Sequence, residues 1–329
     1  MATKTHTVLR GSKRAKDPDA TRVGDVDPKE TFAVTIGLSG PKLPDPSEYV
    51  GKTLRPAELA GKFGATKQDA DRVAKSLKGF GLKVDSVSLA TRSMSVSGTS
   101  AAMEAAFKPG LAIMRSPDQG EYRGRQGTLQ IPTELKGIVT GVFGLDERQM
   151  ARRKSLSAGP VNAATLSPLT PMDIEQRYNF PPGDCAGQNI AIAEFGGGYF
   201  ADDTAAYCIK FNRSTPDVRT VAVDAPAFTL QQILALPPKQ RKEQLDASIE
   251  VMMDVQIIAG LCPKAEITVY FSAFDQGGWV DLLDAVVAEK PAVLSISWGL
   301  AEDNSGWSTS ALAAINDRLN AARLLGITI

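Results

Sequence analysis

The sequence of 329 residues contains a single histidine, His6, which lies in a polar segment near the N-terminus. A Ser-His-Asp triad and a histidine-rich metal site both require imidazole side chains within the folded part of a chain. Neither kind of site can therefore be built from the part of this sequence that is expected to fold.

Cysteine is also scarce, since the chain has three: Cys185, Cys208 and Cys262. Their spacing is not that of a zinc site. Cys262 lies in an apolar run, which predicts a small buried residue. Cys185 and Cys208 could form a disulfide in an exported protein, a pairing that the sequence alone leaves open.

Excess charge and long apolar runs are absent. The chain has 37 Lys and Arg residues and 37 Asp and Glu residues, and this balance argues against a nucleic-acid partner. No apolar run is long enough to span a bilayer, so no membrane partner is predicted. The N-terminus lacks the apolar core of a classical signal peptide, which leaves open another export route or a leader further upstream.

The N-terminal part of the chain predicts a small α+β domain. Residues 1–28 are polar and charged without periodicity and predict a disordered tail. Residues 29–150 predict strands alternating with helices in a compact sandwich. The expected strands are Thr31–Leu38, Leu82–Leu89, Ser93–Ser97, Leu111–Met114 and a segment near Tyr122, and the expected helices are Pro56–Phe63, a helix capped by Thr66, Ser100–Phe107 and Leu135–Val142.

Residues 151–166 are small, polar and basic. This composition predicts a flexible linker that a protease could reach, and a plain interdomain tether fits it equally well.

Residues 167–329 predict a doubly wound parallel sheet, because apolar strands alternate with helices. Ligands of such sheets bind beyond the carboxyl ends of the strands, where Glu194 and the Ser297-Trp298-Gly299 segment fall. The last residues, from Gly326 to Ile329, have the pattern of an opening strand. We therefore expect the sheet to be incomplete at this end and the chain to be a fragment of a longer protein. The expected strands are Asn189–Ala193, Val218–Val223, Ile267–Phe271 and Ala292–Ser297, and the expected helices are Asp203–Phe211, the segment after Ser248, Trp279–Ala288 and Ser310–Leu325.

The predicted helix after Ser248 carries Glu250 and Asp254, four residues apart on one face. At this spacing their Cβ atoms lie about 6 Å apart. Apolar residues occupy nearly every other position of the helix, which is the pattern of a buried helix. Two buried carboxylates are costly unless they share a proton or have a function. An acidic first turn that complements the helix dipole is the alternative, and it explains Glu250 well and Asp254 poorly.

Taken together, these patterns resemble the sedolisin family of serine-carboxyl peptidases, and within it the kumamolisin-like proenzymes. The resemblance runs from about Thr31 to Ile329. Its motif is the Glu250-x-x-x-Asp254 pair, which is followed by an apolar Ala-Gly-Leu-Cys-Pro run and a strand. Further similar stretches are Glu58–Gly64, Gly81–Val84, Met94–Thr99, Tyr122–Arg123, Ile131–Pro132, Val142–Asp146, Leu169–Asp173, Tyr178–Pro181, Ile192–Tyr199 and Ser295–Gly299. The segment Thr53-Leu-Arg-Pro departs from the family's usual basic or histidine-containing start of the first helix.

The resemblance implies a subtilisin-like doubly wound sheet preceded by a ferredoxin-like activation prodomain. It also implies that Glu250 is the general base for a serine nucleophile and that Asp254 orients it. Glu194 and Trp298 would extend and support this network of carboxylates. A carboxylate base with a pKa near ~4.3 works mainly in acid, so an acid-acting endopeptidase is expected.

The strand segment Ser297, Trp298 and Gly299 would pair with the backbone of a polypeptide substrate. The family's oxyanion Asp, its nucleophilic Ser in a Gly-Thr-Ser segment and its calcium site are expected beyond Ile329. The Gly-Thr-Ser at residues 98–100 falls in the prodomain and has no such role. The resemblance therefore implies a secreted or extracytoplasmic precursor, which is inhibited by its own prodomain until the linker is cleaved. Residues 1–329 are expected to be inactive alone.

Two alternatives remain open. A non-catalytic pseudo-protease or inhibitor would keep the prodomain but would have no peptidase activity. A nucleotide-binding module would use the glycines between Phe195 and Tyr199, although the Gly-x-Gly-x-x-Gly fingerprint is missing. Substrate preference, the processing site, the export route and the oligomeric state cannot be predicted from these residues.

Overall fold

The computed structural model describes residues 5–117, 119–150, 169–299 and 306–329. The predicted linker over residues 151–166 lies outside the described residues. The chain divides into two compact units. Unit 1 comprises residues 1–150, 273–290 and 300–328, and unit 2 comprises residues 151–272 and 291–299 together with Ile329.

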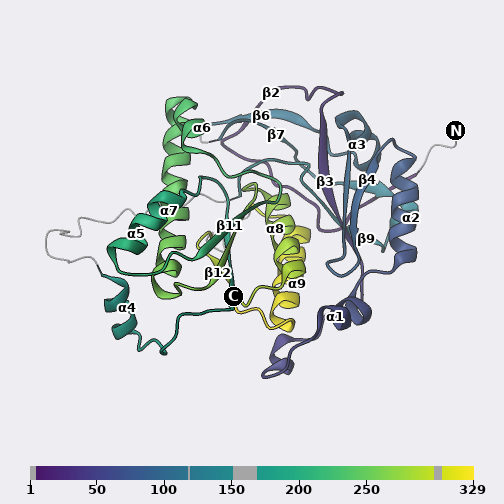
Figure 1. Cartoon of the computed structure of the whole chain (residues 1–329). Coiled ribbons are helices and arrows are strands. Elements are labelled where there is room, and N and C mark those ends of the chain that lie inside the picture. The colour runs from purple at the N-terminus through teal and green to yellow at the C-terminus, as the bar shows by residue number, and fades with distance from the viewer. Residues whose placement is uncertain (1–4, 118, 151–168, 300–305) are drawn as a thin grey trace. The chain divides into compact units, whose positions relative to one another are not determined.

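Unit 1 is built on a four-stranded antiparallel sheet with the strand order β4-β5-β3-β9. Apolar residues face each other across it: Ile36 on β3 is opposite Met94 on β5 and Val142 on β9. Helices α2 and α3 lie beside this sheet in Figure 1, and Leu77 and Phe107 contribute fully buried side chains to the same core. The elements are β3 (Thr31–Leu38), η1 (Pro46–Tyr49), α1 (Pro56–Phe63), α2 (Lys67–Lys78), β4 (Lys83–Ser88), β5 (Ser93–Thr99), α3 (Ser100–Phe107) and β9 (Val139–Phe143).

The predicted disordered tail over residues 1–28 was wrong for the described residues 5–28. Strand β1 (His6–Val8) pairs with β8 (Gln130–Pro132). In a second sheet, β2 (Thr21–Gly24) pairs with β6 (Ala112–Ser116), which also pairs with β7 (Gly120–Gly124). These partners lie about a hundred residues away, so a local pattern could not predict them.

A buried ion pair also holds the N-terminal segment. Arg14 is 2% exposed, and its Nε donates to Oδ2 of the buried Asp146 at 2.5 Å. A buried guanidinium is compatible with folding only when such partners satisfy it. Arg14 thus ties this polar segment to the folded domain through an internal partner.

The predicted helix over Leu135–Val142 was also wrong. A short 3-10 helix, η2 (Thr133–Leu135), ends there, and residues from Val139 onward form β9. Gly137 has φ +83°, a left-handed conformation that interrupts a right-handed helix. The segment is rich in β-branched residues, which favour strands, and this composition predicts a strand better than a helix.

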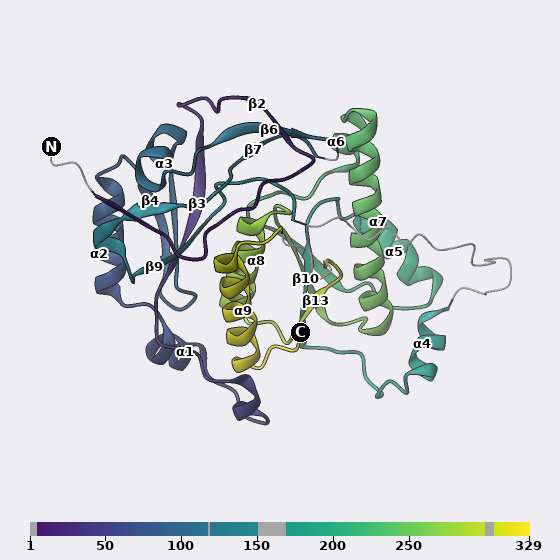
Figure 2. The same cartoon turned by 180° about the vertical axis from the view of Figure 1, so that it is seen from behind.

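Helices α8 (Gln276–Glu289) and α9 (Thr309–Leu324) belong to unit 1, although the sequence suggested a division at the linker. Figure 2 shows the two helices side by side. Thr35 on β3 donates its hydroxyl to Asp281 on α8 at 2.6 Å. Arg318 on α9 donates from Nε to Oδ1 of Asp284 at 2.7 Å. The first contact joins α8 to the antiparallel sheet, and the second joins α9 to α8.

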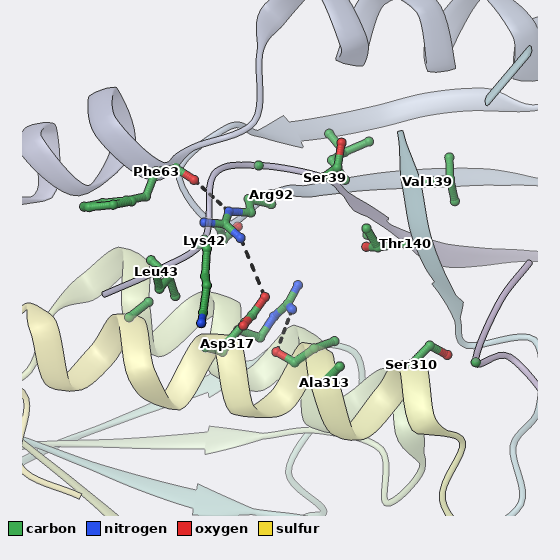
Figure 3. A pocket seen from close by; sticks show the side chains of 18 of the residues that line it. Ser39, Lys42, Leu43, Phe63, Arg92, Val139, Thr140, Ser310, Ala313 and Asp317 are labelled. Atoms are coloured by element: carbon green, nitrogen blue, oxygen red, sulfur yellow. Dashed lines mark hydrogen bonds and ion pairs between the residues drawn. The ribbon is translucent and has the colours of Figure 1, made fainter. Parts of the chain in front are cut away.

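A cavity of about 830 Å³ lies within unit 1, and Figure 3 shows it from close by. Its walls come from β3, β9 and α9, and Val139 and Ala313 are among the lining residues. Arg92 borders it, with Nε donating to the carbonyl of Phe63 at 2.7 Å and Nη1 lying 3.6 Å from Oδ2 of Asp317. None of the site residues expected from the sequence lines this cavity.

Unit 2 contains a four-stranded sheet with the order β11-β12-β10-β13. All of its pairings are parallel, so the parallel sheet predicted from the alternating pattern is confirmed. Its winding and its subtilisin-like class stay predictions. The register pairs Glu194 with Phe271 and Ala193 with Ile296, so Glu194 and residue 297 lie at the same edge. The elements are α4 (Pro171–Arg177), β10 (Asn189–Glu194), α5 (Ala201–Lys210), β11 (Asp217–Ala222), α6 (Leu230–Ala235), α7 (Pro238–Leu261), β12 (Glu266–Phe271) and β13 (Val293–Ile296).

Candidate active site

Helix α7 carries the two carboxylates that the sequence singled out. It is longer than predicted, because it begins at Pro238 and not after Ser248. Pro237 is the N-cap and Pro238 is the first helical residue, a position that tolerates proline because its missing N–H has no intrahelical partner. The Pro-Pro pair therefore starts the helix.

The burial of α7 departs from that of an ordinary amphipathic helix at this point, because two carboxylates are buried beside Val251 and Val255 while other apolar residues are exposed. Glu250 is 9% exposed and Asp254 is 8% exposed. The apolar side chains of Ile249, Met253 and Ile257 are 59%, 41% and 43% exposed. The predicted burial of every apolar face was thus wrong, but the expected burial of both carboxylates was right. Since charged groups are costly to bury, the arrangement favours a functional reason for the pair.

Asp254 is tied to the end of β13. Ser297 donates its hydroxyl to Oδ2 of Asp254 at 2.5 Å. Burial raises the pKa of Asp254 above its ordinary value, the hydrogen bond from Ser297 lowers it, and the nearby Glu250 raises it further. The net rise leaves Asp254 better suited to hold a proton in mild acid than a solvent-exposed carboxyl.

Glu194 lies at the carboxyl end of β10 and is 0% exposed. Its Oε2 accepts a hydrogen bond from the indole Nε1 of Trp298 at 2.9 Å. The Trp298 ring also meets Phe195 edge to face, with centroids 6.0 Å apart. Ser297 and Trp298 follow each other directly after β13. Each therefore donates a hydrogen bond to a buried carboxylate, and the two carboxylates come from different elements.

The glycines after Glu194 bring the chain against α7. A Cβ on Gly197 would lie 2.6 Å from the backbone nitrogen of Ser248, and Gly197 has φ +74°. Gln244 accepts from the backbone N–H of Gly197 at 2.8 Å, and Ser248 accepts from that of Gly198 at 2.9 Å. Side chains of α7 thus occupy the two N–H groups that a phosphate-binding loop would offer to its ligand. This packing accounts for the glycines without a nucleotide.

The described residues bring together most of the predicted site. Glu194, Asp254, Ser297 and Trp298 are joined by two hydrogen bonds, and Glu250 is buried one turn from Asp254. Gly299 follows them in sequence and is exposed. The pattern of the sequence did not predict the hydrogen bond from Ser297 to Asp254.

Two supporting residues were also missed. Gln244 and Ser248 fix the glycine segment, and Ser248 additionally donates to the carbonyl of Gln244 at 2.7 Å. Ser248 was expected to precede the helix, but it lies inside α7, where its hydroxyl bonds to the preceding turn. The signal that could have found both was their spacing, since they lie four residues apart and on consecutive turns before Glu250.

Comparison with known proteins agrees with these motifs. Residues 18–148 match the family model described as "Pro-kumamolisin, activation domain". Kumamolisin from Bacillus sp. (strain MN-32) is 30% identical over 344 residues, which cover 98% of this chain and 60% of kumamolisin. Tripeptidyl-peptidase sed5 from Aspergillus fumigatus is 24% identical over 336 residues, which cover 90% of this chain and 56% of that protein. The chain thus spans somewhat more than half the length of the curated relatives that it matches.

A solved structure of Pseudomonas sedolisin, a serine-carboxyl proteinase complexed with two molecules of pseudo-iodotyrostatin, is a more distant neighbour. It matches with a TM-score of 0.38 and 16% identity, over 48% of this chain and 42% of that one. This similarity is too weak to define the fold of either unit.

The matched activation domain and the identity to kumamolisin over nearly the whole chain give the class: the chain belongs to the sedolisin family and is similar to its kumamolisin-like members. Among the described residues, no helix has the length and apolar character needed to cross a membrane.

Proposed function

We propose that the full-length protein is the precursor of a serine-carboxyl endopeptidase that cleaves polypeptides in acid. One observation carries this proposal: Glu250 and Asp254 are buried on α7, while Ile249 and Met253 of the same helix are exposed. A serine is a weak nucleophile until a base takes its proton, and a carboxylate must serve where no imidazole is available. Glu250 would be that base, and Asp254 would orient it.

The hydrogen bonds of the site support a division of roles. Asp254, whose pKa is raised by burial, would share a proton with Glu250, as coupled carboxylates do. Trp298 would keep Glu194 in place, and the exposed residues Ser297 and Gly299 would pair with the substrate backbone. A carboxylate base must be deprotonated to act, whereas the oxyanion Asp expected from the family must be protonated and therefore requires acid. The two requirements predict an acidic optimum.

We further propose that the ferredoxin-like prodomain inhibits the enzyme until the linker over 151–166 is cut. The match to a pro-kumamolisin activation domain and the β-α-β-β-α-β order of β3, α2, β4, β5, α3 and β9 support this role. Export to an extracytoplasmic compartment follows from the same family membership.

The family's nucleophilic Gly-Thr-Ser segment has no counterpart within unit 2, so residues 1–329 alone should not hydrolyse peptides. The family implies a calcium site, but the part of the chain that the structure describes has no group of three His, Cys, Asp or Glu side chains that could hold a metal ion. We propose that the calcium ion expected from the family binds outside residues 1–329.

The test measures cleavage of an unstructured protein by the full-length product from pH 2 to pH 8. Wild-type protein should show an acidic optimum after processing, and Glu250→Gln should lose activity by about a hundredfold or more, since general-base catalysis contributes roughly 10²–10⁴-fold. Glu243→Gln, on an exposed position of the same helix, is the matched control and should retain activity. A neutral optimum, or full activity of Glu250→Gln, would refute the proposal. No hydrolysis by any full-length form would indicate the pseudo-protease alternative.

A further inference from the structure

The three cysteines of the chain are not arranged as the sequence suggested. Cys208 on α5 is 0% exposed and packs in the core of unit 2 with Val251 and Val255. Cys262, predicted to be a small buried residue, is half-buried at the end of α7. Its Sγ lies 2.7 Å from Sγ of Cys185, which is also half-buried. The pair that the chain brings together is therefore Cys185 and Cys262, not Cys185 and Cys208.

Backbone contacts hold the two cysteines side by side. The N–H of Lys264 donates to the carbonyl of Asp184 at 2.9 Å, and the N–H of Glu266 donates to the carbonyl of Gln188 at the same distance. Lys264 and Asp184 also form an ion pair of 2.7 Å. These contacts join the residue before Cys185 to a residue just after Cys262. The proximity of the two sulfurs is thus fixed by the surrounding chain.

Cys185 itself lies in a tight turn. It has φ +59°, and its carbonyl accepts from the N–H of Gln188 at 3.1 Å. A left-handed backbone is sterically unfavourable for a residue with a Cβ. The turn directs this side chain toward the end of α7. A separation of 2.7 Å needs only a small shift to reach a covalent S–S bond of about 2.05 Å.

We propose that Cys185 and Cys262 form a reversible disulfide, which is the redox-active position of this chain. The oxidant is a small-molecule disulfide. One cysteine attacks it as the thiolate, forming a mixed disulfide and releasing one small thiol. The second cysteine then attacks the sulfur of the first, so that the protein S–S bond forms and the second small thiol leaves. In sum, two protein thiols lose two electrons and two protons, and the small disulfide becomes two thiols.

The position of this bond gives it a structural effect. The two cysteines are 77 positions apart, and the segment between them contains Glu194, Glu250 and Asp254. The bond would link the entry to β10 with the end of α7, the two elements that supply the candidate carboxylates. Burial and the neighbouring Cys185 raise the pKa of Cys262 to about 12, so this sulfur is protonated at neutral pH in the reduced chain. A protonated thiol is a poor nucleophile, so thiol–disulfide exchange at Cys262 is expected to be slow.

The experiment treats purified chain 1–329 with oxidised glutathione, unfolds it and counts free thiols with a maleimide. The expected count falls from three in the reduced chain to one, which is Cys208. Trypsin should then release a linked pair of peptides, residues 178–210 and 243–264. Because the first peptide contains both Cys185 and Cys208, the same digestion is repeated on Cys208→Ala. The linked pair should persist there and be lost in Cys185→Ser and in Cys262→Ser.

A thermal melt gives the second readout. Oxidation should raise the melting temperature of wild-type and Cys208→Ala chains by about 5–10 °C, since the bond closes a long loop. It should leave Cys185→Ser unchanged. Three free thiols after oxidation, a stable glutathione adduct without a linked peptide, or a link that disappears in Cys208→Ala would each overturn the proposal. None of these outcomes depends on peptidase activity.

Discussion

The hydrogen bond between Trp298 and Glu194 predicts a measurable loss of stability when its donor is removed. Trp298→Phe keeps an aromatic ring against Phe195 and deletes the indole N–H, which donates to Oε2 of Glu194 at 2.9 Å. Glu194 is 0% exposed, so water cannot easily replace the lost donor. Hydrogen bonds to charged groups contribute about 1.5–3 kcal/mol, and a buried acceptor left without its donor costs a similar amount. We expect the free energy of unfolding to fall by about 2–3 kcal/mol.

The assay is urea unfolding of chain 1–329 at pH 7, followed by far-ultraviolet circular dichroism so that the lost indole does not affect the signal. Trp298→Phe also removes some packing, and a double-mutant cycle with Glu194→Met separates the two effects. In the Glu194→Met background no carboxylate remains to accept, so the same change should cost at least about 1 kcal/mol less. Equal costs in both backgrounds, within about 0.5 kcal/mol, would refute the assigned role of the hydrogen bond.

Two further predictions concern α7 and the glycine segment. Burial raises the pKa of Asp254, so the folded state binds its proton more tightly than the unfolded state, and the contribution of this residue to stability falls as pH rises above the unfolded value of about 3.8. Asp254→Asn can still accept a hydrogen bond from Ser297, and it should therefore be more stable than wild type at pH 7. Chemical unfolding should show that the difference in the free energy of unfolding between the two disappears below pH 3.8. A difference that stays constant with pH would contradict this prediction. Gly197→Ala should lose about 2 kcal/mol more stability than Gly187→Ala, because both glycines have φ +74° but only the first would press a Cβ against the backbone of Ser248. Equal losses in urea unfolding would show that the close approach to α7 has no energetic weight.

Local signals predicted much of the secondary structure. Strand β3 and helices α1 and α3 have the bounds expected from the sequence, and Thr66 caps α2 as expected, accepting from the N–H of Asp69. In each case the signal lies within a few residues: a periodic apolar pattern, a proline at the first helical position or a capping hydroxyl. Information of this kind is present in a single sequence.

The errors arose where distant residues decide the structure. Residues 5–28 fold because β1 pairs with β8 and because Arg14 finds Asp146, more than a hundred residues away. The contact between Cys185 and Cys262 likewise depends on where α7 ends relative to β10. A charged segment resembles a solvated one until its partner is known, and two cysteines cannot be paired from spacing alone.

The candidate site was predictable in its residues but not in its connections. The spacing of Glu250 and Asp254 identified them as a pair, and the parallel sheet brought Glu194 near Trp298 by a general rule for strand ends. The hydrogen bond from Ser297 to Asp254 depends on side-chain directions that no periodicity encodes. Exposure of Ile249 and Met253 was not expected either, because an apolar pattern alone does not distinguish a covered face from an open one.

Ser297 and Trp298 are neighbours on a single stretch of backbone, yet they bond to carboxylates carried by α7 and β10. A displacement of this stretch would lengthen both bonds together, so neither carboxylate can be adjusted without the other. A molecule that binds along this stretch and displaces it would therefore change the hydrogen bonding of both carboxylates at once.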